Sequence, residues 1–165
     1  MKKILFTIVL TLVSVCGFAQ QTAGNELKKA PDFTMNDSEG KAVSLYEYIK
    51  GKKCVLIDFW ASWCAPCRAE GKNVKAIYAD YKEKGFTVLG VSMDTKEPMW
   101  RKAMTEEAYP WTQVSDLKGF KSTVCELFGF KAIPALYLID GEGNVLAVNL
   151  RGEALRNKIA ETLSK

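Results

Sequence analysis

The sequence of 165 residues contains no histidine, and this absence removes several classes of functional site at once. Without an imidazole there is no Ser-His-Asp or Cys-His nucleophilic site, no histidine-containing zinc site and no C-x-x-C-H attachment site for haem. The chain also carries little excess charge, with a formal net charge of +4 at pH 7. That excess is too small to indicate a nucleic-acid partner or an anionic membrane surface. The remaining candidates for chemistry are cysteine and carboxylate side chains.

A long hydrophobic run is missing as well. The apolar run at residues 4–15 falls short of the ~20 residues that a membrane-spanning helix needs. It follows two lysines and precedes small residues, so residues 1–19 are predicted to be a secretory signal peptide cleaved after Ala19. The alternative is a lipoprotein anchored through Cys16, although the bulky valine before that cysteine argues against it. We therefore expect an exported protein of the periplasm or cell envelope, where cysteines are paired or perform redox chemistry.

The rest of the chain predicts a flexible leader over residues 20–30 and one α/β domain over residues 31–165. Strand-like and helix-like segments alternate along this domain. The expected elements are a hairpin over 31–43, helices over 44–49, 65–84, 98–108, 121–128 and 152–163, strands over 54–60 and 86–93, an extended piece over 111–115, and a hairpin over 135–150. This order indicates a mixed sheet with helices on both faces.

The segment Trp63-Cys64-Ala65-Pro66-Cys67 lies between a predicted buried strand and a predicted helix. The unpaired N–H groups of a helix N-terminus favour a thiolate, and C-x-x-C cysteines have pKa values lowered from ~8.5 to between ~3.5 and ~7.5. We expect Cys64, at the exposed edge, to attack a disulfide, and Cys67, one turn further in, to resolve the mixed disulfide. The alternatives are a permanently closed structural disulfide and half of a zinc site completed by Cys54 and Cys125.

These motifs resemble the thioredoxin superfamily, because Trp-Cys-x-Pro-Cys follows a strand with Asp-Phe-Trp and precedes Ala-Ile-Pro at 132–134. The N-terminal hairpin, the segment inserted between residues 93 and 121 and the signal peptide resemble its exported TlpA/ResA-type branch. The resemblance covers nearly all of residues 31–165. It implies an α/β thioredoxin-like fold, with a mixed central sheet, helices on both faces and an N-terminal β-hairpin.

The same resemblance implies a thiol–disulfide oxidoreductase that reduces disulfides of exported proteins, with apocytochrome c as one example. Electrons would come from a membrane-bound thiol donor. We expect no cofactor, no metal and no nucleic-acid partner, and we expect the chain to act as a monomer.

The resemblance also implies residues for substrate binding. Pro134 matches the family's cis-proline, and Ile133 before it would pair with the substrate backbone. Trp63 is expected to shape the surface beside the cysteines and to contact partners. From the residues alone, a trans proline that opens a strand is the alternative for Pro134.

Two carboxylates are candidate helpers of the cysteines. Asp58 lies in an apolar strand, where burial raises the pKa of a carboxyl group, and the resemblance makes it the proton acceptor for Cys67. Glu70 matches an acid that such proteins carry near the site. The alternatives are a structural buried aspartate and a solvated helix glutamate. Related proteins often have a helix-kinking proline after this glutamate, and here Gly71 is predicted to supply the bend.

Other functions of related folds fit the sequence less well. A peroxiredoxin-like thiol peroxidase needs a threonine three residues before its cysteine, where this chain has Ala61. A copper chaperone of the superfamily uses C-x-x-x-C with a distant histidine, and the chain has neither. A thiol oxidase or disulfide isomerase performs the same exchange as a reductase and differs in reduction potential, so the sequence leaves the direction open.

Two further cysteines lie outside the motif. Cys54 opens the predicted core strand, and Cys125 lies on the helix before Pro134. Free cysteine is often buried, so we expect two inert core thiols. A second disulfide is the alternative and requires Cα atoms within ~7 Å of each other.

Overall fold

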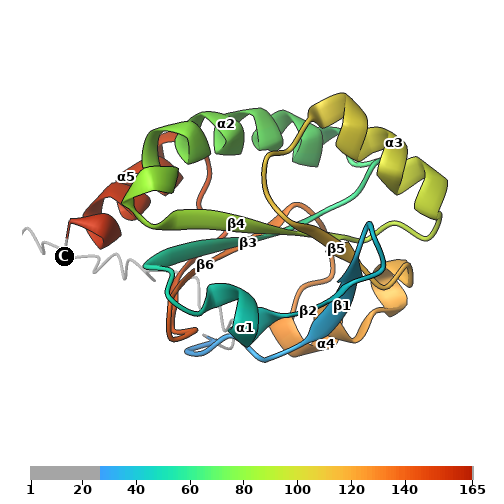
Figure 1. Cartoon of the computed structure of the whole chain (residues 1–165), viewed down its shortest axis with the longest axis horizontal. Helices are drawn as coiled ribbons and strands as arrows, with labels where there is room; N and C mark the ends of the chain where they lie inside the picture. The colour runs from blue at the N-terminus through green and yellow to red at the C-terminus, as the bar shows by residue number, and fades with distance from the viewer. Residues whose placement is uncertain (1–26, 165) are drawn as a thin grey trace, which may run out of the picture.

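A mixed sheet with helices on both sides forms the framework of the protein, in a computed structural model that describes residues 27–164 (Figure 1). The strands are β1 (Thr34–Asp37), β2 (Ala42–Ser44), β3 (Cys54–Trp60), β4 (Phe86–Ser92), β5 (Gln113–Ser115), β6 (Ala135–Asp140) and β7 (Val145–Val148). The helices are α1 (Leu45–Ile49), α2 (Ala65–Tyr81), α3 (Glu97–Glu107), α4 (Thr123–Phe128) and α5 (Gly152–Leu163), with 3₁₀ turns at Lys82–Lys84 and Gly119–Lys121.

The strand order β2-β1-β5-β4-β3-β6-β7 places the longest apolar strands at the centre. β3 runs parallel to β4 and antiparallel to β6. Figure 1 shows α2, α3 and α5 on one side of the sheet and α1 and α4 on the other. Strands covered on both sides need apolar residues at every position, which explains the near-continuous apolar sequences of β3 and β4.

Alternation along β3 divides its side chains between two cores. Cys54 and Leu56 pack in a cluster with residues of α2 and α5, whereas Ile57 and Phe59 pack in the cluster on the other face. Asp58 has the same parity as Leu56, so it faces α2 and α5. The sheet therefore holds one carboxylate beneath the helix that begins with the cysteine motif.

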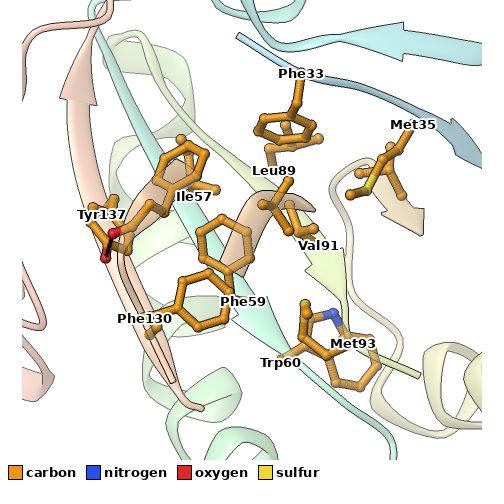
Figure 2. Packing of buried hydrophobic residues seen from close by; sticks show 14 of the residues in the cluster. Phe33, Met35, Ile57, Phe59, Trp60, Leu89, Val91, Met93, Phe130 and Tyr137 are labelled. Carbon is orange, nitrogen blue, oxygen red and sulfur yellow. Dashed lines mark hydrogen bonds between the residues drawn. The ribbon is translucent and has the colours of Figure 1, made fainter. Parts of the chain in front are cut away.

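Aromatic rings fill the core on the opposite face, near the end of β3 (Figure 2). The ring centroid of Phe59 lies 4.5 Å from that of Phe130 and 5.9 Å from that of Tyr137. Phe128 also meets Phe59 at 5.0 Å in an edge-on arrangement. Such pairs contribute about 0.5–1.5 kcal/mol each beyond the area they bury. They fix the end of β3, from which the cysteine loop departs.

The thioredoxin-like fold and the N-terminal hairpin are confirmed, and the main differences lie at the ends of elements. The helix expected over 65–84 ends at Tyr81 and continues only as a 3₁₀ turn. The helix expected from residue 121 begins at Thr123, because residues 119–121 form a separate turn. α2 continues through Gly71 without a break, and the glycine there leaves space for the ring of Tyr109.

The folded part begins before the boundary expected at residue 31. The N–H of Ala30 donates to the carbonyl of Gly143 at 2.8 Å, and the N–H of Val145 donates to the carbonyl of Lys28 at 2.9 Å. Ala30 is also buried. Residues 27–30 thus lie along the turn into β7, where backbone pairing compensates for their polar sequence. The predicted signal peptide, 1–19, and the leader before residue 27 lie outside the described residues. Within residues 27–164 no helix is both long and apolar enough to cross a membrane.

Candidate active site

The cysteine motif lies where β3 ends and α2 begins. Cys64 is the N-cap residue of α2, and its Sγ accepts a hydrogen bond from the N–H of Cys67 at 3.3 Å. The N–H of Cys64 donates to the carbonyl of Ala61 at 3.0 Å, which closes the loop after β3. Pro66 falls in the first helical turn, where a missing N–H costs no helical hydrogen bond.

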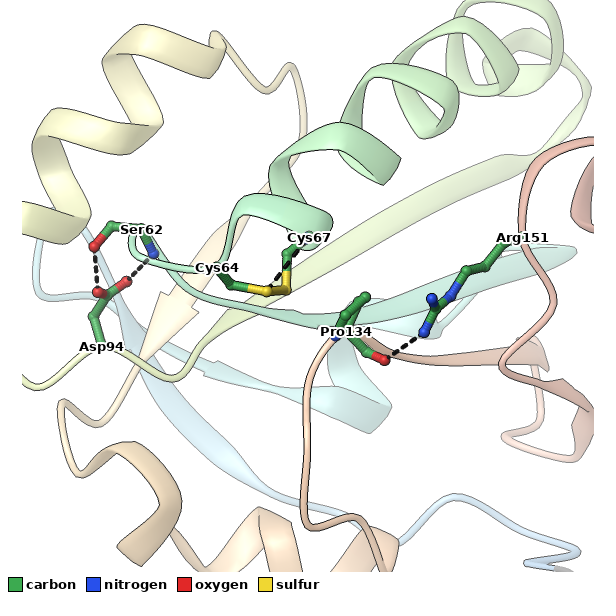
Figure 3. Close-up of a disulfide and its surroundings, with 6 residues drawn as sticks. All are labelled: Ser62, Cys64, Cys67, Asp94, Pro134 and Arg151. Carbon is green, nitrogen blue, oxygen red and sulfur yellow. Dashed lines mark hydrogen bonds between the residues drawn. A yellow bond between two sulfur atoms is a disulfide. The ribbon is translucent and has the colours of Figure 1, made fainter.

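Cys64 and Cys67 form a disulfide in the structure, with Cα atoms 5.3 Å apart (Figure 3). The exposed fraction is 4% for Cys64 and 3% for Cys67, so the expected difference in exposure between them is absent in this oxidised form. What separates the two sulfurs is their position on the helix. Cys64 precedes the first turn, where free N–H groups stabilise a thiolate, and Cys67 lies within that turn.

Asp58 is buried on the α2 side of the sheet, with 5% of its surface exposed. The pKa of its carboxyl group is raised to about 7, mainly by burial and also by the charge of Glu70, while the charge of Arg151 opposes the rise. A carboxyl group with this pKa can accept and release a proton near neutral pH. Perturbed carboxyl groups of this kind are common at functional sites.

Glu70 links α2 to α5 rather than pointing freely into solvent. Its Oε1 accepts a hydrogen bond from the N–H of Gly152 at 3.0 Å, and its Oε2 accepts one from Asn73 at 3.1 Å. Gly152 is the first residue of α5, where a negative charge interacts favourably with the helix dipole. Glu70 is therefore held where its charge acts on Asp58.

The peptide bond between Ile133 and Pro134 is cis, in agreement with the geometry that the family resemblance implied. Ala135, the next residue, pairs with Phe59 of β3, so Pro134 lies at the same edge of the sheet as the cysteine loop (Figure 3). Arg151 donates a hydrogen bond to the Pro134 carbonyl at 2.9 Å. Pro134 also lines a groove of about 570 Å³ whose wall includes Phe130.

Trp63 projects from the rim of the site, with 59% of its surface exposed. Its ring centroid lies 6.2 Å from that of Phe120, which is 47% exposed and belongs to the turn before α4. Two aromatic rings from separate loops thus form one apolar patch beside the disulfide. Sequence reasoning missed Phe120, because no pattern in the sequence brings its turn close to residue 63.

Three other residues near the site were also missed. Asp94 binds the loop that carries Cys64. Arg151 donates to the carbonyl of Pro134, and its charge lowers the pKa of Asp58. The position of Asp94 just after β4 was the one available signal, since the carboxyl ends of neighbouring parallel strands meet at one edge. Tyr109 packs on Gly71 of α2, a contact between distant segments with no signal in the sequence.

The two other cysteines that the structure describes are free thiols. The second disulfide that we considered as an alternative is therefore absent between them. Cys54 is buried at the start of β3, where burial and the charge of Asp140 raise its pKa to about 12. Cys125 in α4 is only half-buried, unlike the core thiol that we expected, and burial raises its pKa as well. Over residues 27–164 no group of three or more acidic or cysteine side chains is arranged to hold a metal ion.

Comparison with known proteins agrees with this site. Residues 27–148 match the AhpC/TSA family. The thiol-disulfide oxidoreductase ResA of Bacillus thuringiensis subsp. konkukian (strain 97-27) is 28% identical over 173 residues, which cover 99% of this chain and 96% of the relative. ResA of Bacillus cereus (strain ATCC 10987 / NRS 248) is 30% identical over 138 residues, covering 84% and 76% respectively.

Solved structures show the same relationship. The thioredoxin domain of a thiol-disulfide oxidoreductase from Bacteroides vulgatus superposes with a TM-score of 0.76 at 38% identity, covering 82% of this chain and 95% of that one. A thiol-disulfide oxidoreductase from Bacteroides fragilis NCTC 9343 gives a TM-score of 0.76 at 32% identity, covering 81% and 98%. With its paired cysteines at a helix N-terminus, the chain belongs to the AhpC/TSA family of thioredoxin-like proteins and is a thiol–disulfide oxidoreductase of the ResA type that acts on proteins.

Proposed function

We propose that the protein works as a reductant of disulfides in exported proteins. The observation that carries this direction is the absence of a free positive charge along the motif. Ala65 and Pro66 between the cysteines are uncharged, and Arg68 after them forms ion pairs with Glu106 at 2.8 Å and Glu107 at 2.5 Å. Neighbouring cations stabilise a thiolate and hence the reduced form. Without that stabilisation the dithiol gives up its electrons more readily, and the reduction potential is low.

In the proposed reaction the thiolate of Cys64 attacks one sulfur of a substrate disulfide. The substrate S–S bond breaks, a mixed disulfide forms, and the other substrate sulfur leaves as a thiolate. Cys67 then transfers its proton to Asp58 and attacks the sulfur of Cys64. The mixed disulfide breaks, the Cys64–Cys67 disulfide forms, and two electrons have passed to the substrate, which takes up two protons.

The surface around the motif supports a role in holding an extended substrate segment. We assign Ile133 to backbone pairing with the substrate, and Trp63 to contact with its apolar side chains. The groove lined by Pro134 has apolar walls that include Phe130 and Val148. Glu70 would act through its charge on Asp58 rather than by touching the substrate.

Export to the periplasm or cell envelope and recharging by a membrane-bound thiol donor complete the proposal. They rest on the signal peptide predicted over residues 1–19 and on similarity to the ResA relatives. Apocytochrome c is the substrate that we propose to test first. We propose that the protein acts on it as a monomer.

The direction is tested by the reduction potential of the Cys64–Cys67 pair against glutathione. We expect a value near that of thioredoxin, about −270 mV, rather than near that of the oxidant DsbA, about −120 mV. A potential close to the second value would overturn the proposed direction and favour an oxidase. An intermediate value near −180 mV, about that of protein disulfide isomerase, would favour an isomerase.

A further inference from the structure

Two loops leave the same edge of the sheet beside the disulfide. Trp60 and Ser92 are the last paired residues of the parallel strands β3 and β4. The N–H of Met93 donates to the carbonyl of Trp60 at 2.7 Å and keeps the two chains together beyond the sheet. Ser62 and Asp94 each follow two residues after these strand ends, and Figure 3 shows their side chains facing each other.

The Asp94 carboxylate accepts three hydrogen bonds at this position. Its Oδ1 accepts from the Ser62 hydroxyl at 2.6 Å, and its Oδ2 accepts from the Ser62 N–H at 2.9 Å and from the Ser92 hydroxyl at 2.8 Å. Only 1% of Asp94 is exposed, and it takes part in no ion pair with the residues that the structure describes. Hydrogen bonds to an ionised acceptor are about twice as strong as neutral ones, so the buried carboxylate is a firm anchor.

The anchored residue is two positions before Cys64. Both the backbone N–H and the hydroxyl of Ser62 are bound, and the next turn is closed by the bond from the Cys64 N–H to the Ala61 carbonyl. Ser92 is held in turn by the neighbouring strand β5, because its carbonyl accepts a hydrogen bond from the Ser115 hydroxyl at 2.9 Å. These hydrogen bonds connect the loop of Cys64 to the central strands, so α2 is not the one element that fixes its position.

We propose that Asp94 is a positioning residue for the redox reaction, and that it stabilises the Cys64–Cys67 disulfide relative to the dithiol by holding the Cys64 loop. This role rests on the proposed function and concerns the same site. In the dithiol no bond joins the sulfurs, so the loop alone limits how far Cys64 moves away from Cys67. A restrained loop raises the effective concentration of one thiol at the other, and this favours the disulfide. Asp94 thereby makes the protein a stronger reductant.

The first test is the equilibrium of the Asp94→Ala variant with glutathione. In this reaction two molecules of reduced glutathione give up two electrons and become glutathione disulfide, while the Cys64–Cys67 disulfide becomes a dithiol. We expect the equilibrium constant for reduction of the variant to rise roughly tenfold, which corresponds to about 30 mV. Ser62→Ala keeps the bond from the backbone N–H and should give a smaller rise in the same direction. An unchanged constant in both variants would overturn the proposal.

A second measurement separates positioning from a merely structural role. The disulfide and the anchor stabilise each other, so urea unfolding of Asp94→Ala should show a larger loss of stability in the oxidised form than in the reduced form. Equal losses in both forms would mean that Asp94 only supports the fold. If Asp94→Ala does not fold, Ser62→Ala provides both measurements.

Asp140→Ala is the matched control, because this carboxylate also accepts three hydrogen bonds, from the N–H of Glu142 and from the N–H and side chain of Asn144. Asp140 pairs with Cys54 at the start of β3, which is the opposite edge of the sheet. We expect its variant to leave the glutathione equilibrium unchanged, and a shift as large as that of Asp94→Ala would count against the proposal. A high reduction potential of the unaltered protein would overturn only the proposed direction. The role of Asp94 is tested separately, by the difference in equilibrium constant between the variant and the unaltered protein.

Discussion

At the scale of single residues, the chemistry depends on an asymmetry between Cys64 and Cys67 that exposure does not explain. Both sulfurs are buried in the disulfide, but only Cys64 precedes the first turn of α2. After the disulfide opens, the N–H groups of that turn favour a thiolate at Cys64. Cys67 is then the thiol that must lose its proton within the protein. Asp58 is a buried carboxyl group on the side of the sheet that α2 covers, the side that Leu56 also faces.

This asymmetry predicts different behaviour for the two serine variants. Cys67→Ser should accumulate a mixed disulfide with a protein substrate, because the attack by Cys64 still occurs and its resolution does not. Cys64→Ser should form no such complex and should lose disulfide reduction. Mass spectrometry under non-reducing conditions measures both products. Cys125→Ser is the control and should behave like the unaltered protein. Equal activity in the Cys64 and Cys67 variants would contradict the assignment of attacking and resolving sulfurs.

The pKa of Asp58, raised to about 7 mainly by burial, predicts how the resolving step depends on pH. Below this pKa the carboxyl group is protonated and cannot accept the proton of Cys67, so the rate should rise as the pH passes through about 7. Asp58→Asn should remove this inflection and slow the step by about 100-fold or more, as for loss of a general base. Single-turnover kinetics with a preformed mixed disulfide measure the rate.

Glu70→Gln provides a graded control for this assignment. The charge of Glu70 raises the pKa of Asp58, so its removal should move the inflection to lower pH without abolishing it. An inflection that stays in place in the Asp58→Asn variant would show that another group accepts the proton.

A residue of the site could be predicted where it is unusual in its local sequence. Asp58 stands out because a carboxylate interrupts an apolar strand, and Cys64 and Cys67 stand out by their spacing. Asp94 and Phe120 lie in loops, where polarity or an aromatic ring is ordinary. Their importance comes from contacts between segments about thirty to sixty residues apart, and no local pattern encodes such contacts.

At the scale of elements, α2 is shaped by one contact with the segment after α3. A Cβ atom at Gly71 would lie 2.2 Å from the Tyr109 hydroxyl oxygen, so only glycine leaves room for this ring. The ring has little freedom to retreat, because its centroid lies 5.1 Å from that of Trp60 and 5.0 Å from that of Trp111. Sequence reasoning assigned Gly71 a bend from its low helix propensity, whereas the structure gives it a packing role.

Gly71→Ala should therefore destabilise the protein, although alanine is the better helix former by about 1 kcal/mol. We expect a net loss of roughly 1–3 kcal/mol, the usual cost of overpacking, in the free energy of unfolding measured with urea. Removing the hydroxyl with Tyr109→Phe should recover part of the loss in the double variant. Additive effects of the two substitutions would argue against this contact.

Most helices and strands could be predicted from the sequence, and those that could not are short segments. β3 and β4 have near-continuous apolar sequences, and α2 has a proline in its first turn, so their positions follow from local sequence. β5 has three residues, and its pairing with both β1 and β4 depends on the rest of the sheet. The 3₁₀ turn at Gly119–Lys121 is likewise set by its surroundings rather than by periodicity.

At the scale of the whole molecule, the reactive groups lie at the carboxyl ends of the central strands β3 and β4. The free thiol of Cys54 lies at the opposite end of β3. The loops after β3 and β4 and the cis-proline before β6 meet at the disulfide edge because β3 is parallel to β4 and antiparallel to β6. The N-terminal hairpin joins the sheet through β5, away from β6 and β7. The hairpin thus extends the flank of the sheet that lies away from the cis-proline loop before β6.

The buried carboxyl group of Asp58 should also affect the stability of the whole protein as the pH changes. Its pKa is about 7 in the folded, oxidised protein and about 3.9 in the unfolded chain. Between these values the folded state binds more protons than the unfolded state, so the free energy of unfolding falls as the pH rises from about 4 to about 7. Three pKa units correspond to about 4 kcal/mol, which is an upper bound for this residue.

Asp58→Asn lacks this titration, so its stability relative to the unaltered protein should increase from pH 4 to pH 8 by up to about 4 kcal/mol. Urea unfolding of both oxidised proteins across this range gives the difference, in which groups common to both cancel. Asp140 is one such group: partial burial raises its pKa, but hydrogen bonds from Asn144 outweigh that effect and leave the pKa lowered. A difference that stays constant with pH would show that Asp58 is ionised in the folded protein throughout. Together with a lost kinetic inflection, a growing difference would identify one carboxyl group that lowers the stability of the fold at neutral pH and accepts the proton that the redox reaction releases.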